Sequence, residues 1–298
     1  MIRRRQLFRA SFFGLLFLLG CAGAQSGNPA AEDAIALPNP LRLTVTDELG
    51  IEALERDYGA FQAALAAALG VAVELVPVED QVSGVLLLKD GKVDLALVGP
   101  SEYVVIHART NAIPVIGITR PDYRSVLAVR SDSPIRSVAD LRGKTLALSD
   151  VGSTSGHLGP VQMLVAAGLD PQTEVTVEML GDEGSIEALT AGKAAAWGGS
   201  LTDYRAMAGD DPEAFRIVQE GEPLPSDLLV ANSQLPGAVV TAIQTKILAQ
   251  ETALTTAIAE QENKYRGSTL KTPQDSDYDG IRTAYRTIGQ GAFIDAEN

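Results

Sequence analysis

Three hydroxyl side chains and a glycine follow one another at Ser153-Thr154-Ser155-Gly156. The preceding residues, 145–149, read as a strand, and residues 158–167 carry apolar side chains at helical spacing. A helix that begins after a strand presents unpaired N–H groups and the positive end of its dipole, and the hydroxyls add directional donors. This segment could therefore bind an oxyanion without Lys or Arg, although Ser and Thr before a helix also serve as ordinary N-caps.

The same segment lacks the partners that catalysis would need. His157 lies two residues after Ser155, and positions i and i+2 do not face each other on a helix. Thr154 stands where a nucleophile elbow requires serine, and no Gly-Lys-Ser/Thr of a phosphate-binding loop follows. The two histidines and one cysteine of the chain give no metal-ligand spacing. We therefore expect a binding protein without metal or cofactor, and not an enzyme.

Strand-like and helix-like patterns alternate along the chain. Strands are expected at residues 41–46, 72–78, 93–98, 113–119, 126–130, 145–149, 175–180 and 215–218. Helices are expected at residues 52–69, 82–89, 101–109, 158–167 and 185–191. This alternation predicts an α/β protein with largely parallel sheets that carry helices on both faces. About 258 residues follow position 40, which is more than one typical domain, so we expect two lobes.

Binding sites in such sheets lie beyond the carboxyl ends of the strands. The Ser-Thr-Ser turn satisfies this rule, and so do Gly99-Pro-Ser-Glu-Tyr103 and the loop after residues 194–197. Polar loops from both halves of the chain therefore favour a ligand held between two lobes. Trp197, the only tryptophan, belongs either to the core or to the wall of that cleft.

The N-terminus indicates export. Four arginines within the first nine residues precede an apolar run at 10–20, which is too short to span a membrane and is typical of a secretory signal peptide. The run ends in Leu18-Leu-Gly-Cys21, which resembles the lipobox of bacterial lipoproteins. We expect residues 1–20 to be removed and Cys21 to be lipid-modified. The lipid would hold the protein at the periplasmic or extracellular face of a bacterial membrane.

Charge and composition narrow the partners further. Residues 21–40, rich in Ala, Gly, Ser, Asn and Pro, are expected to form a flexible tether. The chain has 24 Lys and Arg against 38 Asp and Glu, and removal of the four signal arginines leaves 20 − 38, or −18. So acidic a protein is a poor partner for nucleic acid or anionic lipid. An anion site here would depend on short-range hydrogen bonds.

Three stretches carry a resemblance to a known family. They are Tyr123-Arg-Ser-Val-Leu-Ala-Val-Arg-Ser-Asp-Ser-Pro-Ile135, Val138-Ala-Asp-Leu-Arg-Gly-Lys144 and Asp150-Val-Gly-Ser-Thr-Ser-Gly-His-Leu-Gly-Pro160. Together with shorter motifs at 91–100, 187–193, 223–227 and 275–280, they resemble the phosphate/phosphite/phosphonate-binding proteins of ABC importers, the PhnD-like family. The resemblance extends from about residue 41 onward.

This resemblance implies a type II periplasmic binding-protein fold, in which two α/β lobes joined by two crossing strands close on a ligand at the hinge. The crossings should fall near residues 123–129 and 228–232. Lobe 1 would then combine residues 41–125 with 232–298, and lobe 2 would comprise residues 126–231.

The resemblance also implies which residues bind the ligand. The family's oxyanion donors fall on Ser153, Thr154 and Ser155, helped by the backbone N–H groups of Ser155 and Gly156. Tyr123 matches a tyrosine whose hydroxyl reaches the ligand, Asp227 matches an aspartate of the cleft, and Asp203 stands where phosphonate binders have a glutamate. Two positions depart from the pattern: Gln81 replaces a cleft tyrosine, and Asp182 or Glu183 replaces a histidine.

Carboxylates beside an anionic ligand need compensation, because two like charges ~4 Å apart repel by about 4 kcal/mol at an effective dielectric constant of 20. An ammonium group on the ligand could pair with Asp203 and Asp227, or a protonated oxyanion could donate a hydrogen bond to a carboxylate. The sequence leaves phosphonate, phosphite and phosphate open as ligands.

The expected partners of this monomer are the permease and ATPase of an ABC importer. The alternative is a sensory binding protein that signals to a membrane receptor kinase, because a fold does not determine whether a bound ligand is transported or reported.

Overall fold

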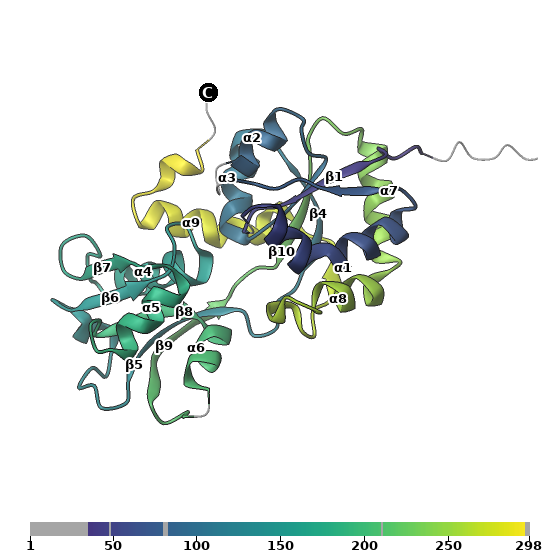
Figure 1. The fold of residues 1–298 in the computed structure, drawn as a ribbon. Coiled ribbons are helices and arrows are strands. Elements are labelled where there is room, and N and C mark those ends of the chain that lie inside the picture. The colour runs from purple at the N-terminus through teal and green to yellow at the C-terminus, as the bar shows by residue number, and fades with distance from the viewer. Residues whose placement is uncertain (1–34, 48, 80–82, 210, 296–298) are drawn as a thin grey trace, which may run out of the picture. The chain divides into compact units, whose positions relative to one another are not determined.

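The computed structural model describes residues 35–47, 49–79, 83–209 and 211–295 (Figure 1). Within them the chain forms two separate β-sheets, each flanked by helices. One sheet has six strands in the order β11-β4-β10-β3-β1-β2, and the other has five in the order β7-β6-β8-β5-β9. The expected signal peptide, most of the tether, Cys21 and Gln81 lie outside the described residues.

The six-stranded half combines the beginning and the end of the chain. Its strands are β1 (Leu41–Val45), β2 (Val73–Leu75), β3 (Leu95–Val98), β4 (Ile113–Ile118), β10 (Asp227–Ala231) and β11 (Leu270–Lys271). Its helices are α1 (Ile51–Leu69), α2 (Ser83–Lys89), α3 (Pro100–Thr110), α7 (Gly237–Leu248), α8 (Glu251–Ile258) and α9 (Asp279–Thr287), with single turns η3 (Asn263–Tyr265), η4 (Asp275–Tyr278) and η5 (Gly291–Phe293).

The five-stranded half is formed by the middle of the chain. Its strands are β5 (Arg124–Arg130), β6 (Thr145–Leu148), β7 (Thr176–Met179), β8 (Ala196–Ser200) and β9 (Phe215–Pro223). Its helices are α4 (Gly159–Ala166), α5 (Gly181–Thr190) and α6 (Leu201–Ala208), with the turn η1 (Val138–Leu141) and the π-helical turn η2 (Thr154–Leu158).

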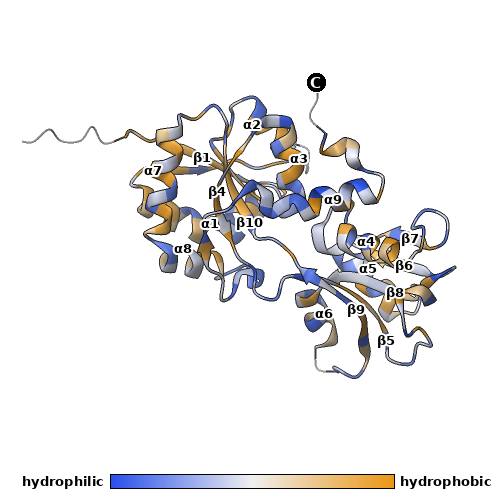
Figure 2. Ribbon diagram, turned by 180° about the vertical axis from the view of Figure 1, so that it is seen from behind, coloured by the Kyte–Doolittle hydropathy of each residue, from blue (hydrophilic) through white to orange (hydrophobic). Residues whose placement is uncertain are grey.

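The helix α1 illustrates how the pattern of apolar residues positions an element. Its buried side chains recur every three or four residues and so form one stripe: Leu54, Tyr58, Phe61, Leu65 and Leu69. The helix ends at Gly70, whose φ of 75° is a left-handed conformation that glycine adopts without strain. The stripe packs on the six-stranded sheet, whose central strands β3 and β10 are mostly hydrophobic (Figure 2). None of the described helices is long and apolar enough to cross a membrane.

The strand directions correct one expectation from the sequence. Both sheets are mixed and not largely parallel: β10 runs antiparallel to β3 and β4, and β5 runs antiparallel to β8 and β9. The reason is that the chain passes from one sheet to the other twice, at residues 119–123 and 224–226. The strands next to these crossings therefore enter their sheets against the direction of their neighbours.

The second crossing comes earlier in the chain than the resemblance implies. The strand β10, which the expected boundary at residue 231 would assign to lobe 2, lies inside the six-stranded sheet between β3 and β4. All five of its residues are buried, so this apolar strand is covered on both faces. At the first crossing, β5 already begins at Arg124.

The C-terminal helix α9 joins the two halves. Its buried residues, Ile281, Ala284 and Tyr285, belong to a core cluster that also contains Leu146 and Leu148 of β6 and Val104 of α3. It contacts α3 of the six-stranded half and both α4 and η2 of the five-stranded half. The turn that contains Thr154 and Ser155 is therefore supported from both halves.

Candidate functional site

The hydroxyl-rich segment forms a π-helical turn that leads into α4. Ser153 precedes the turn, and its Oγ accepts a hydrogen bond from the backbone N–H of Gly156 at 3.2 Å. Ser153 thus acts as an N-cap, and the Gly156 N–H, expected to help the ligand, has an internal partner. The side chains of Thr154 and Ser155 are buried. We call residues 153–156 the hydroxyl turn.

The hydroxyl turn meets the opposite half of the molecule at Thr154. Its Oγ1 accepts a hydrogen bond from the backbone N–H of Ser101, in the first turn of α3, at 3.1 Å. Tyr123, which ends the first crossing, lies close to the same turn: burial raises the pKa of its hydroxyl, and Arg120, Ser155 and Thr154 lower that pKa in part. Donors from both halves and from the crossing therefore converge on the turn.

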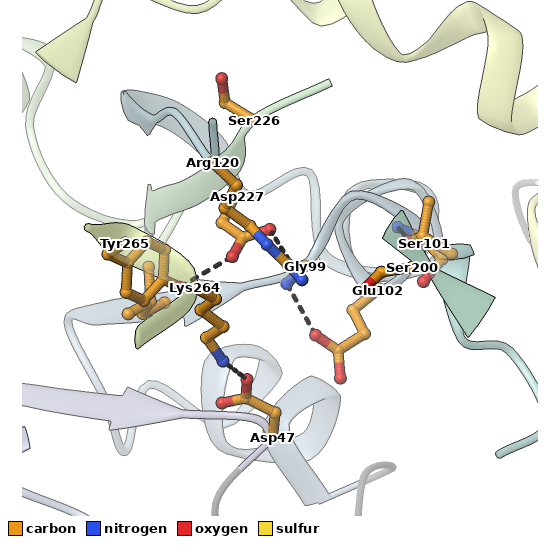
Figure 3. Close-up of polar contacts among 12 residues, drawn as sticks. Asp47, Gly99, Ser101, Glu102, Arg120, Ser200, Ser226, Asp227, Lys264 and Tyr265 are labelled. Atoms are coloured by element: carbon orange, nitrogen blue, oxygen red, sulfur yellow. Dashed lines mark hydrogen bonds and ion pairs between the residues drawn. The ribbon is translucent and has the colours of Figure 1, made fainter. Parts of the chain in front are cut away.

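Behind Tyr123 lies a buried ion pair that the sequence patterns did not reveal (Figure 3). The Arg120 guanidinium stacks on the Tyr123 ring, with its central carbon 3.7 Å from the ring centroid, and Nη1 lies 3.5 Å from Oδ1 of Asp227. The other oxygen of Asp227 accepts a 2.7 Å hydrogen bond from the Tyr265 hydroxyl. Asp227 is only 3% exposed. We call Arg120, Tyr123, Asp227 and Tyr265 the hinge cluster.

The hinge cluster contains one cationic side chain, Arg120, and one carboxylate, Asp227. Burial on its own lowers the pKa of Arg120, but the negative groups around it, Asp227 among them, raise that pKa above its ordinary value. Arg120 is therefore a permanent cation, stacked on the ring of the tyrosine whose hydroxyl lies near Thr154 and Ser155. An anion bound by Tyr123, Thr154 and Ser155 would lie in the field of this charge.

A carboxyl group of α3 lies beside the same cluster (Figure 3). Glu102 Oε2 accepts hydrogen bonds from the Gly99 N–H at 2.7 Å and from Thr46 Oγ1 at 2.8 Å. Burial, and then the negative charge of Asp47, raise the pKa of Glu102 from 4.5 to about 7, although these two hydrogen bonds lower it in part. Asp47 itself pairs with Lys264 Nζ at 2.6 Å.

The raised pKa of Glu102 should make stability depend on pH. The folded chain holds this proton more tightly than the unfolded chain, so the free energy of unfolding falls as pH rises through the interval between 4.5 and about 7. For a half-buried group we expect a loss of about 1 to 3 kcal/mol. Urea unfolding at about pH 5 and about pH 8 should show a smaller loss in Glu102→Gln than in the parent chain. Glu52→Gln, on the exposed first turn of α1, is the control, and equal losses in all three proteins would contradict this account.

Other residues considered for the site make hydrogen bonds within the chain. Asp203 is exposed, and its Oδ2 accepts a 2.5 Å hydrogen bond from Ser200, the N-cap of α6, so it serves the helix terminus. Asp182 accepts a hydrogen bond from the Ser149 hydroxyl. Trp197 is a core residue, 2% exposed, and donates to Ser185 Oγ at 3.0 Å. His157 accepts a hydrogen bond from the Gly152 N–H at 3.0 Å, away from Ser155.

The sequence contained signals for some of the residues that it did not single out. Ser101 and Glu102 belong to the polar loop after β3 that the strand-end rule identifies. Arg120 lies three residues before Tyr123, in the first crossing, but nothing in the local pattern indicates that its charge turns inward. Tyr265 and Lys264 approach Asp227 from a distant part of the chain, which only the fold brings near.

The side chains gathered at the hydroxyl turn are suited to binding a ligand. The described residues contain no group of three or more His, Cys, Asp or Glu side chains suited to a metal ion. The hydroxyls of Thr154, Ser155 and Tyr123 are neutral donors, and Arg120 supplies positive charge behind them. Such a set is suited to a small anion with several oxygens.

Known proteins are similar to this chain in sequence and in fold. The family model for the phosphonate periplasmic substrate-binding protein of ABC transporters matches residues 48–278. The Phosphate-import protein PhnD of Mycolicibacterium smegmatis is 25% identical over 294 residues, which cover 89% of this chain and 91% of that protein.

Solved structures extend the likeness to the fold. PhnD1 from Prochlorococcus marinus (MIT 9301), in complex with methylphosphonate, has a TM-score of 0.69 and 17% identity, covering 85% of this chain and 100% of that one. The aliphatic sulphonate binding protein SsuA from Escherichia coli has a TM-score of 0.60 and 18% identity, covering 86% and 89%. The fold is therefore that of the type II periplasmic binding proteins. Because the family model spans most of its length, the chain belongs to the phosphonate-binding family of periplasmic substrate-binding proteins of ABC transporters.

Proposed function

We propose that this chain is a lipid-anchored receptor that captures a phosphorus oxyanion, phosphate, phosphite or a phosphonate, between its two halves and delivers it to an importer. The observation that carries the proposal is that Ser101, from the opposite half, and Tyr123, from the crossing, both approach Thr154 of the hydroxyl turn. The ligand would be held by the hydroxyls of Ser153, Thr154, Ser155 and Tyr123. The halves would move about residues 119–123 and 224–226.

Import is favoured over signalling by the similar proteins. The relative in Mycolicibacterium smegmatis is a phosphate-import protein, and PhnD1 of Prochlorococcus marinus has been crystallised with methylphosphonate. We accordingly propose a membrane permease and its ATPase as partners, and a monomer as the working form. Export agrees with membership of a periplasmic family.

Removal of the Thr154 hydroxyl tests the site. A hydrogen bond to a charged ligand contributes about 1.5 to 3 kcal/mol, so Thr154→Ala should bind about 10- to 100-fold more weakly. Calorimetric titration with phosphate, phosphite, methylphosphonate and 2-aminoethylphosphonate measures this. Thr190→Ala, on the exposed face of α5, is the matched control. If the parent chain binds none of the four compounds, it is not a receptor for phosphorus oxyanions. If it binds one of them and Thr154→Ala binds that compound equally well, the ligand does not bind at the hydroxyl turn.

The lipid anchor depends on Cys21 alone. Expressed in a bacterium with its own leader, the parent chain should partition into the detergent phase on Triton X-114 extraction, because acyl chains add ~0.8 kcal/mol per buried methylene. Cys21→Ser should partition into the aqueous phase. Equal partitioning of the two proteins would contradict lipidation at this residue.

A further inference from the structure

The carboxylates that face the hinge cluster already have partners within the chain. Asp227 uses one oxygen for Tyr265 and holds the other 3.5 Å from the Arg120 guanidinium. Asp47 pairs with Lys264, and Asp203, which accepts a hydrogen bond from the Ser200 hydroxyl, is one of the carboxylates whose charge acts on Arg120. A ligand ammonium that approached Asp227 would have to displace a buried arginine from its counter-ion.

Arg120 also has a direct effect on any group near the hydroxyl turn. Its charge stacks on the face of Tyr123, and the hydroxyl of Tyr123 lies close enough to Thr154 and Ser155 for both to lower its pKa. A cation over an aromatic ring draws electron density from the ring, so the Tyr123 hydroxyl becomes a stronger donor to an anion. The same charge attracts a bound oxyanion and repels an ammonium group, with little screening because Tyr123, Asp227 and Tyr265 are buried and the Arg120 side chain is only 18% exposed.

We propose that Arg120 makes this site selective for oxyanions without an ammonium group, such as inorganic phosphate and simple alkylphosphonates, against aminoalkylphosphonates. This inference rests on the proposed function and specifies its ligand class. Arg120 is a positioning residue: it neutralises Asp227, fixes the Tyr123 ring and supplies positive charge to the turn. The ligand then needs neither an ammonium group nor a protonated oxygen to compensate the cleft carboxylates, because Arg120 supplies the positive charge.

Two ligands of matched size separate charge from shape. In 2-aminoethylphosphonate an ammonium stands where propylphosphonate has a methyl group, and the heavy-atom skeleton is otherwise the same. In calorimetric titrations of the parent chain we expect propylphosphonate to bind about 10-fold more tightly or better. If propylphosphonate is too large for the site, the shorter matched pair, ethylphosphonate and aminomethylphosphonate, should show the same preference. If 2-aminoethylphosphonate binds as tightly as propylphosphonate or more tightly, the inference is overturned while oxyanion binding stands; if no compound binds, both fail.

Variants test whether Arg120 is the cause. Arg120→Gln should reduce the preference for propylphosphonate to within about threefold, and Arg120→Lys, which keeps the charge, should retain most of it. Because Arg120→Gln leaves Asp227 without its cation, the double variant Arg120→Gln, Asp227→Asn removes both charges and should show the same reduced preference. Arg205→Gln, in an exposed pair with Asp122, should keep the parent's preference. An unchanged preference in both the single and the double variant would overturn the role of Arg120.

Discussion

Replacing Asp227 with alanine is expected to lower the free energy of unfolding by about 3 to 5 kcal/mol, because it leaves Arg120, whose side chain is only 18% exposed, without its counter-ion. Asp227 begins β10 opposite Ile118 of β4, and its carboxylate serves both Arg120 and Tyr265. The substitution therefore removes a hydrogen bond and strands a charge at once. A loss of this size is a large fraction of the stability of an ordinary domain.

Urea unfolding of the ligand-free protein measures this effect. Arg205→Ala provides the matched control, because Arg205 and Asp122 form a pair at 2.8 Å with both side chains more than half exposed, and should cost less than about 1 kcal/mol. The double variant Arg120→Gln, Asp227→Asn should cost less than Asp227→Ala, since no unpaired charge remains. Equal losses for Asp227→Ala and Arg205→Ala would show that the hinge pair is solvated in solution.

The second large effect is expected from Gly159→Ala, at the first residue of α4. A β-carbon at this position would lie 2.0 Å from Oγ and 2.7 Å from the β-carbon of Ser125, a buried residue of β5. Neither the strand nor the helix can move apart without disturbing the hydroxyl turn, which leads directly into α4. We expect a loss of about 2 to 3 kcal/mol from overpacking. Displacement of the turn should also weaken oxyanion binding, by about 10-fold for one lost hydrogen bond.

A second substitution at the contact separates this clash from a general effect of alanine. Ser125→Gly removes both clashing atoms, so Gly159→Ala, Ser125→Gly should recover stability relative to Gly159→Ala. Gly237→Ala, at the first residue of α7, is the control, because a β-carbon there meets no atom within 4 Å. Thermal unfolding and phosphate titration should be measured on all four proteins. If Gly159→Ala is as stable as Gly237→Ala, α4 does not pack on β5 this closely.

The elements of the first half of the chain can be predicted closely from the sequence because their apolar periods are regular. The period of α1 places the helix within one residue of its start. By contrast, the direction of β10 depends on its neighbours β3 and β4, which lie more than 100 residues away in sequence. The helix α9 did carry a signal, since Ile281, Ala284 and Tyr285 have helical spacing, but this spacing cannot indicate that the helix joins both halves.

The candidate site was predictable to the extent that its residues are contiguous. The hydroxyl turn lies in one segment, and Tyr123 and Asp227 belong to motifs of the family. Arg120 was not predictable in this way, because an arginine at a strand end is usually solvated. Its inward position is favourable only because the fold brings Asp227 and Tyr265, from distant parts of the chain, next to it. Asp203 illustrates the opposite case: its position matches a ligand residue of the family, yet locally it caps a helix.

The hydrogen bond from Ser101 to Thr154 has a consequence for the resting equilibrium of the receptor. The N-cap of α3 is Gly99, which has no side chain to satisfy the first N–H groups of the helix, so the opposite half supplies that acceptor. In the proposed receptor, separation of the halves would uncap α3, at a cost of about 1 kcal/mol, which would change the ratio of closed to open molecules about fivefold. The proposed closed form would thus be enriched before any ligand arrives. A substitution at Thr154 alters this population as well as the affinity of the closed form.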